Sequence, residues 1–201
     1  MTNKALKDFR NAIHKDLKVE PQNERSNCFI IEENKEQSTI KEIQLTFKNQ
    51  DDVLIIKQDN SDDLKKNYTI ANLFQTNSPN NTNKSCDFIV FLNSKQNGLE
   101  IFYCEIKSST CENSQKEAML QIESSQLFVL FLLEYYKLRY PKNDLDYFQI
   151  PHKNLCIYPK LGISQKNKTY VSEKGQVLYL KDIDFANGCA KISDGYDFFR
   201  I

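Results

Sequence analysis

The chain has 201 residues, 40% of them hydrophobic, which is enough for one domain with a sizeable core. Lys plus Arg and Asp plus Glu each number 27, so the zero net charge excludes the overall basic excess that marks many nucleic-acid-binding domains. The longest apolar run, residues 127–133, is far shorter than the ~18 residues of a membrane span, and residues 1–20 lack the apolar segment of a secretory signal. We therefore expect a cytoplasmic protein without membrane association.

The N-terminal part of the chain predicts one helix followed by strands. Apolar residues recur at helical spacing from Leu6 to Leu17, which predicts an amphipathic helix over residues 3–18. A short helix is expected over residues 68–74. Between these helices, three β-prone segments separated by polar residues predict a small meander: residues 27–32, 40–48 and 53–58.

The middle of the chain predicts a hairpin. Asn97-Gly98 lies between two β-prone segments and is a strong signal for a hairpin. Residues 86–92 and 99–107 should therefore pair as antiparallel strands.

A long helix and a second hairpin are expected after the first hairpin. The capping-box sequence at residues 114–117 predicts the start of a helix that ends before Pro141. The centre of this helix is apolar on all sides, as expected for a helix buried against a sheet. Residues 154–160 predict a further strand, and residues 169–181 predict a hairpin that turns at residues 173–175. This order of elements indicates an α/β fold, in its α+β variant, with helices packed on a mixed sheet.

Charged residues occupy unusual places in the first hairpin. Glu105 and Lys107 end an apolar strand and share one face of it, because side chains alternate along a strand. An acid-x-Lys tripeptide occurs four times in the chain and is uninformative alone. At this position, however, the preceding strand carries Asp87 near its start, and the following helix carries Gln121. The charges are either a simple ion pair at a strand end or part of an active site.

The stretch "CDFIVF…IFYCEIKSS…AMLQ" resembles the PD-(D/E)XK nuclease superfamily, which has the restriction-endonuclease-like fold. The family pattern is an acid on one strand, Glu/Asp-x-Lys on the next, and a helix that often carries Gln or Lys. The matching residues are Asp87, Glu105, Lys107 and, less securely, Gln121. Cys86 stands where many members have Pro, and the resemblance covers only about forty residues.

The resemblance implies a metal-dependent endonuclease that hydrolyses DNA, with a role in restriction or anti-phage defence. In the family, residues equivalent to Asp87, Glu105 and the carbonyl of Ile106 hold Mg²⁺, for which Mn²⁺ can substitute. Lys107 would orient or deprotonate the attacking water, and Gln121 would position water or phosphate. Because the net charge is zero, a homodimer or an activating partner protein is expected to assist DNA binding.

The resemblance also implies one nuclease domain over residues 1–201. Its parts are the N-terminal helix and meander (residues 1–75), the catalytic core (residues 86–160) and the C-terminal hairpin (residues 169–201). A lysine-rich segment follows the last strand of the predicted core, and either contacts DNA phosphates or is a solvated face. The candidate phosphate-contacting residues are Lys160, Lys166 and Lys168.

Two other classes of function stay open. The first is a non-catalytic module with the same fold that binds a partner protein or nucleic acid, and the second is an unrelated structural α/β protein. Cys–His catalysis by His152 with Cys156 or Cys111 is a weaker alternative. No CxxC pair occurs among the six cysteines, so buried free thiols rather than disulfides or a zinc site are expected.

Overall fold

Two β-sheets and three helices form the described part of the protein. The computed structural model describes residues 3–23, 26–33, 38–58, 84–142, 145–160 and 168–201. The seven-stranded sheet contains, in spatial order, β1 (Lys18–Val19), β4 (Val53–Ile56), β5 (Phe88–Ser94), β6 (Gly98–Ile106), β7 (His152–Pro159), β9 (Val177–Ile183) and β8 (Lys168–Val171). The three-stranded sheet contains β10 (Cys189–Ile192), β3 (Glu42–Thr46) and β2 (Cys28–Glu32). The helices are α1 (Asn3–Ala12), α3 (Glu112–Arg139) and α4 (Gly195–Phe198), with short 3-10 turns at Lys15–Leu17, Gln50–Asp52 and Tyr147–Gln149.

The large sheet is mixed, as the order of elements predicts. Strands β1, β4, β5 and β6 are antiparallel neighbours, whereas β6, β7 and β9 run parallel to one another. Strand β8 closes one edge by pairing antiparallel with β9. The expected α/β class with helices on a mixed sheet is therefore confirmed.

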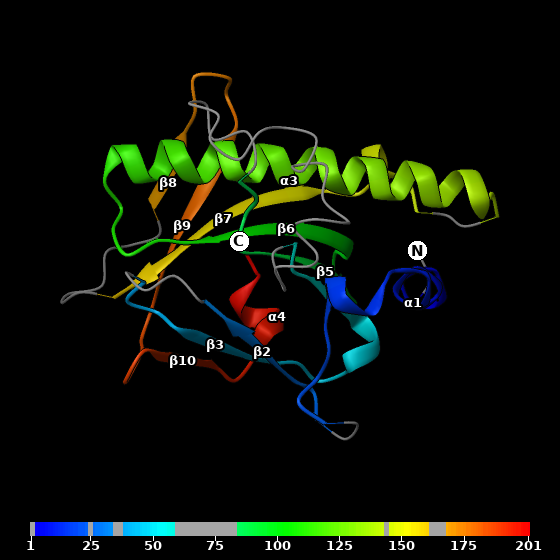
Figure 1. Ribbon diagram of the computed structural model, residues 1–201, viewed down its shortest axis with the longest axis horizontal. Helices are drawn as coiled ribbons and strands as arrows, with labels where there is room; N and C mark the ends of the chain where they lie inside the picture. The colour runs from blue at the N-terminus through cyan, green and yellow to red at the C-terminus, as the bar shows by residue number, and fades with distance from the viewer. Residues whose placement is uncertain (1–2, 24–25, 34–37, 59–83, 143–144, 161–167) are drawn as a thin grey trace.

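The large sheet has an apolar core on each face. Helices α1 and α3 cover one face, and the small sheet with α4 covers the other (Figure 1). Neighbouring residues of one strand alternate between the two cores, so that Tyr103 of β6 lies in the first and Cys104 in the second. A strand buried on both faces in this way reads as a continuous apolar run, as β5 and β6 do.

Both predicted hairpins are present. β5 and β6 pair in register from Phe88 opposite Cys104 to Ser94 opposite Gly98, and Gly98 has a φ of 73°, a conformation that a side chain disfavours. β8 and β9 pair around a turn in which Gly175 has a φ of 77°. Local turn chemistry thus specifies both connections.

The long helix is also present, but it begins earlier than predicted. α3 starts after Cys111, two residues before Ser114, and the Cys111 side chain makes no capping hydrogen bond. The helix ends at Arg139, and its C-cap residue Tyr140 immediately precedes Pro141. The helix packs against the large sheet, as predicted, but with one face only, and apolar residues of its opposite face are exposed (Figure 1).

The predicted N-terminal elements are partly wrong. The first helix stops at Ala12, and a 3-10 turn and β1 follow it. β2 and β3 do pair, but β4 is buried at all four positions and lies inside the large sheet instead of completing a meander. β10 pairs parallel with β3, which joins the two ends of the chain in one sheet. The helix predicted over residues 68–74 lies outside the described residues.

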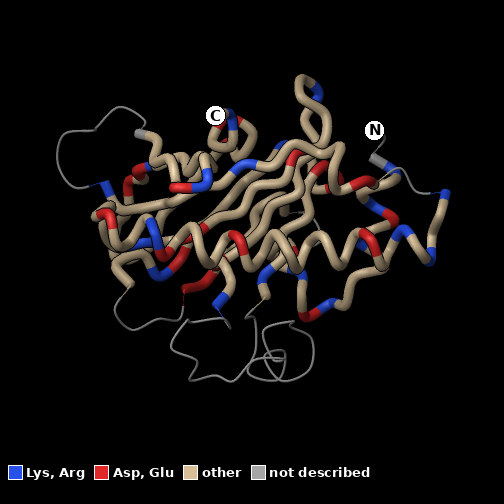
Figure 2. Tube along the Cα trace, turned by 90° about the horizontal axis from the view of Figure 1, so that it is seen from above, with Lys and Arg blue, Asp and Glu red and all other residues tan. Residues whose placement is uncertain are grey.

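Helices long and apolar enough to cross a membrane are absent from the part of the chain that the structure describes. Its charged residues of both signs are interspersed along the trace, as Figure 2 shows.

Candidate active site

Two carboxylates lie opposite each other at one end of the β5–β6 hairpin. Extending the register by one residue from Phe88 and Cys104 places Asp87 directly opposite Glu105. The Asp87 backbone N–H donates a hydrogen bond to Glu105 Oε2 at 3.2 Å, and the Ile106 N–H donates one to Asp87 Oδ2 at 2.5 Å. Each carboxylate is therefore oriented by the backbone of the opposite chain segment.

Lys107 joins these carboxylates to the long helix. Its Nζ lies 2.9 Å from Glu105 Oε1 and donates a 2.8 Å hydrogen bond to Gln121 Oε1 on α3. Glu117, one turn earlier on α3, lies 3.8 Å from the same ammonium group. The structure thus brings together all four side chains that the sequence predicted for the catalytic centre.

The site is buried at its base and reaches solvent on one side. Glu105 is 0% exposed, Asp87 4% and Gln121 7%. The Lys107 side chain is 15% exposed, and that of Glu117 is 61% exposed. Solvent therefore reaches this cluster through Lys107 and Glu117, whereas the carboxylates of Asp87 and Glu105 are buried.

Two buried cysteine thiols beside this site, Cys156 and Cys86, have raised pKa values. Burial is the main cause that raises the pKa of Cys156 to about 12; the charge of Glu105 acts in the same direction, and that of Lys107 opposes it. Burial also raises the pKa of Cys86 above its ordinary value, and Glu105 and Asp87 act in the same direction. The two carboxylates thus make the neighbouring thiols harder to ionise, in addition to the larger effect of burial.

The Ile106 backbone places a third oxygen on the side of β6 that faces Asp87. The N–H and C=O of one strand residue point to the same side of the strand. Since the Ile106 N–H points to Asp87, its carbonyl faces that side as well. Clusters of three or more His, Cys, Asp or Glu side chains able to hold a metal are absent from the described residues. A metal here would thus need two carboxylates together with backbone, water or substrate oxygens, which is how Mg²⁺ is commonly held.

A buried polar chain fixes the backbone just before Asp87. The Cys86 N–H donates to Ser125 Oγ at 2.9 Å, and Ser125 Oγ donates to Gln58 Oε1 at 2.6 Å. Ser125 is 0% exposed and lies one turn after Gln121 on the inner face of α3. The sequence interpretation missed both residues, although a serine within the apolar centre of α3 was a usable signal.

A second buried ion pair, between β6 and β7, can be compared with the Glu105–Lys107 pair. Lys153 Nζ lies 2.8 Å from Glu100 Oε1, and their side chains are 17% and 6% exposed. Lys153 also donates to the carbonyl of Ile201, so this pair ties the C-terminal residue to the sheet. A buried Glu–Lys pair is therefore not by itself a mark of catalysis in this protein.

The described structure does not show the candidate DNA-contacting lysines lying close together. Lys160 lies 3.3 Å from Asp184. Lys166 lies outside the described residues, and of Lys168 only the backbone, in β8, is described. Their contact with DNA stays a prediction.

The Cys–His alternative has no geometric support. His152 Nδ1 lies 3.2 Å from the Tyr103 hydroxyl, and its Nε2 lies 2.8 Å from the Tyr147 carbonyl. Both ring nitrogens thus face oxygen partners rather than Cys156 or Cys111. All six cysteines are free, but the prediction that they are buried holds for only three of them: Cys28 and Cys189 are half-buried and Cys111 is exposed.

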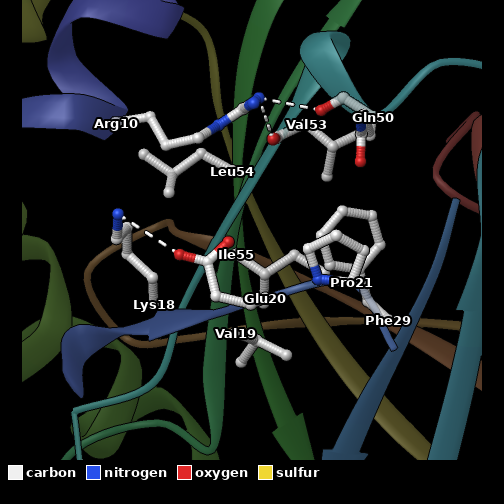
Figure 3. Close-up of a pocket in the computed structure, with 10 residues that line it drawn as sticks. All are labelled: Arg10, Lys18, Val19, Glu20, Pro21, Phe29, Gln50, Val53, Leu54 and Ile55. Carbon is white, nitrogen blue, oxygen red and sulfur yellow. Dashed lines mark hydrogen bonds and ion pairs between the residues drawn. The ribbon is translucent and has the colours of Figure 1, made fainter. Parts of the chain in front are cut away.

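A pocket of about 220 Å³ lies apart from this site, between α1 and the β1–β4 edge (Figure 3). Arg10 points into it and donates to the carbonyls of Gln50 and Val53, while Lys18 pairs with Glu20. These contacts are internal to the protein, and the pocket contains none of the predicted site residues.

No family model, curated protein or solved structure matches this chain.

Proposed function

We propose that this protein is a metal-dependent endonuclease of the restriction-endonuclease-like fold that hydrolyses DNA phosphodiester bonds. The observation that carries the proposal is the position of Lys107, which contacts Glu105 Oε1 at 2.9 Å and Gln121 Oε1 at 2.8 Å where Asp87 lies opposite Glu105. An ion pair alone would need neither a second carboxylate nor an amide from a separate helix. Their convergence favours a catalytic centre over a structural ion pair.

The residues fit a Mg²⁺ or Mn²⁺ ion held by Asp87, Glu105 and the Ile106 carbonyl. Carboxylate and carbonyl oxygens are the ligands that these ions prefer. An ionised carboxylate has about four acceptor positions, so the backbone N–H bonds to Asp87 and Glu105 orient these groups and are compatible with coordination. When bound, the ion would polarise the phosphoryl group and lower the pKa of an attacking water.

Lys107 would act directly on the reacting groups. Its ammonium can donate hydrogen bonds to the attacking water and to a phosphoryl oxygen, which offsets the negative charge that develops during hydrolysis. Gln121 accepts one of the three N–H bonds of this ammonium and so holds it in place.

The choice of DNA as substrate and of a role in restriction or anti-phage defence rests on the family resemblance. The zero net charge supports the expectation that a second copy or an activating partner assists DNA binding. Lys160, Lys166 and Lys168 stay the predicted phosphate contacts.

Cleavage of a mixed panel of plasmid and linear DNA tests the proposal. The wild type should cut with Mg²⁺ or Mn²⁺ and stop on addition of a chelator. Glu105→Gln and Lys107→Ala should each lower the cleavage rate by roughly 100-fold or more, the size of loss typical when one charge-stabilising group is removed. Glu100→Gln is the matched control, because it removes a comparably buried ion pair from the same strand and should keep the activity.

Two results would contradict the proposal. One is a Glu105→Gln protein that cuts as fast as the wild type. The other is equal loss in Glu105→Gln and Glu100→Gln, which would mean that both ion pairs only support the fold. Thermal melting of each variant identifies any loss that comes from unfolding, and Lys107→Gln replaces Lys107→Ala if the latter does not fold. DNA binding without cleavage under any metal condition would favour the non-catalytic module.

A further inference from the structure

Helix α3 carries two apolar faces on opposite sides. Its inner face packs on the large sheet through residues that include Ala118, Ile122, Val129 and Leu133. At 3.6 residues per turn, a second set of large apolar side chains falls on the opposite side of the helix. This outer stripe consists of Leu120, Leu127, Phe131, Tyr135 and Leu138, which are 62%, 64%, 54%, 51% and 75% exposed.

The outer stripe gathers most of the large exposed hydrophobic residues of the described structure. It contains five of the nine large exposed hydrophobic residues among those that the structure describes. Single exposed apolar residues are ordinary, whereas a contiguous apolar patch marks an interaction surface. The stripe extends from Leu120 to Leu138, about 27 Å along the helix.

The spacing of the stripe is that of a coiled-coil seam. Steps of three and four residues lead along α3 through Leu120, Ser124, Leu127, Phe131, Glu134 and Leu138. Four of these six seam positions are large and apolar. Tyr135 lies beside the seam at its C-terminal end.

From this pattern we infer that the outer stripe packs against the outer stripe of a second copy of this chain, with the two α3 helices antiparallel about a twofold axis. A twofold interface requires a patch that complements itself. With the axis near residue 129, Leu120 of one copy meets Leu138 of the other, and Leu127 meets Phe131. Each apolar seam residue then finds an apolar partner.

Charges beside the seam favour the antiparallel arrangement. Glu123 and Lys137 lie on the same flank of the stripe, two turns from its centre in opposite directions. In the antiparallel pair, Glu123 of each copy faces Lys137 of the other, whereas in a parallel pair this flank of each helix would lie on opposite sides of the seam and the two charges would not meet. In the single chain these residues form exposed ion pairs with Lys174 and Asp146, which contribute little and can be exchanged.

The area of the stripe is sufficient for a weak dimer. Five large side chains on each of two copies would bury on the order of 1,000 Å², the lower limit for a specific interface. The inference is independent of the proposed nuclease function, because Lys107 and Gln121 contact each other on the inner side of α3.

Sedimentation of the full chain from about 1 to 100 μM, the range suited to a weak interface, tests this inference. The wild type should show a monomer–dimer equilibrium, and the double variant Leu127→Glu/Phe131→Glu should raise Kd by roughly 100-fold or more, because central apolar anchors dominate interfaces. Val171→Glu is the matched control, since Val171 is 58% exposed but lies on β8. This control should dimerise as the wild type does.

A charge exchange tests the antiparallel register. Glu123→Lys or Lys137→Glu alone should raise Kd by about threefold to tenfold, because each creates two like-charge pairs, and the double exchange should restore the wild-type value. A wild type that stays monomeric at all concentrations would overturn the inference. A dimer that survives the Leu127/Phe131 double variant, or charge variants without mutual rescue, would overturn it as well. If Leu127→Glu/Phe131→Glu does not fold, the Glu123/Lys137 charge exchange alone tests the inference.

Discussion

At the scale of single residues, two buried glutamates on β6 have different surroundings. Glu100 pairs with Lys153, which also holds the C-terminal carbonyl and lies 5.4 Å from the Phe102 ring. Glu105 pairs with Lys107 at a point where Asp87 and an amide of α3 also meet. The ion pair itself does not distinguish structure from chemistry. The groups around the ion pair make the distinction: Asp87 and the amide of Gln121 meet at Glu105 but not at Glu100. For this reason we assign catalysis to Glu105.

Cys111 allows a pH-dependent prediction at the same scale. Hydrogen bonds with Ser114 and Ser109 lower the pKa of this exposed thiol to about 7. The reactive species is the thiolate, whose fraction rises with pH through the pKa. Iodoacetamide labelling of Cys111, followed by mass spectrometry, should therefore accelerate between pH 6 and 8 with a midpoint near 7.

The other thiols and one variant serve as controls. Cys156, which is buried and has its pKa raised to about 12, should label only after unfolding. Ser114→Ala should move the midpoint for Cys111 upward, because it removes the largest contribution to the lowered pKa. A wild-type midpoint near 9 would show that Ser114 does not stabilise the thiolate.

At the scale of elements, α4 closes the second core. The Asp194 carboxylate caps this short helix by accepting the Asp197 N–H at 3.2 Å. Phe199 follows it and stacks with Phe47 of the small sheet region at 6.4 Å between ring centroids. Gly195 begins the helix against the same Phe47 ring, so that an added Cβ would overlap the ring.

Gly195→Ala should therefore destabilise the protein through overpacking. We expect a loss of about 2 kcal/mol in the free energy of unfolding, or roughly 5 °C in Tm, measured by thermal melting with circular dichroism. In a Phe47→Leu background the same substitution should cost less, because the smaller side chain relieves the overlap. Equal costs in both backgrounds would contradict this explanation of the glycine.

At the scale of the whole molecule, sequence reasoning succeeded where local chemistry decides the structure. Asn97-Gly98 specifies the first hairpin, and Pro141 ends α3 at the expected residue. The hairpin also fixes the register that places Asp87 opposite Glu105. The predicted residues of the catalytic centre therefore came together because they lie on adjacent elements joined by predictable turns.

Features that depend on distant pairing were not predictable in the same way. The small sheet needs β10 beside β3, which lie far apart in the sequence and carry no local signal for each other. The polar chain from Cys86 through Ser125 to Gln58 likewise joins three separate elements. The exposure of the outer stripe of α3 was not predictable from the sequence, because an apolar helix surface looks the same whether it is buried against the sheet or exposed.

Metal binding is the most direct test of the central claim, because it does not depend on finding the right DNA sequence. Titration with Mn²⁺, followed by the electron paramagnetic resonance signal of the free ion, should show one site per chain in the wild type. Asp87→Asn and Glu105→Gln should each weaken binding at this site by about 10-fold or more, as expected for loss of a coordinating charge. Glu100→Gln should bind as the wild type does. Equal Mn²⁺ affinity in the wild type and Asp87→Asn would contradict the assignment of a metal centre between β5 and β6.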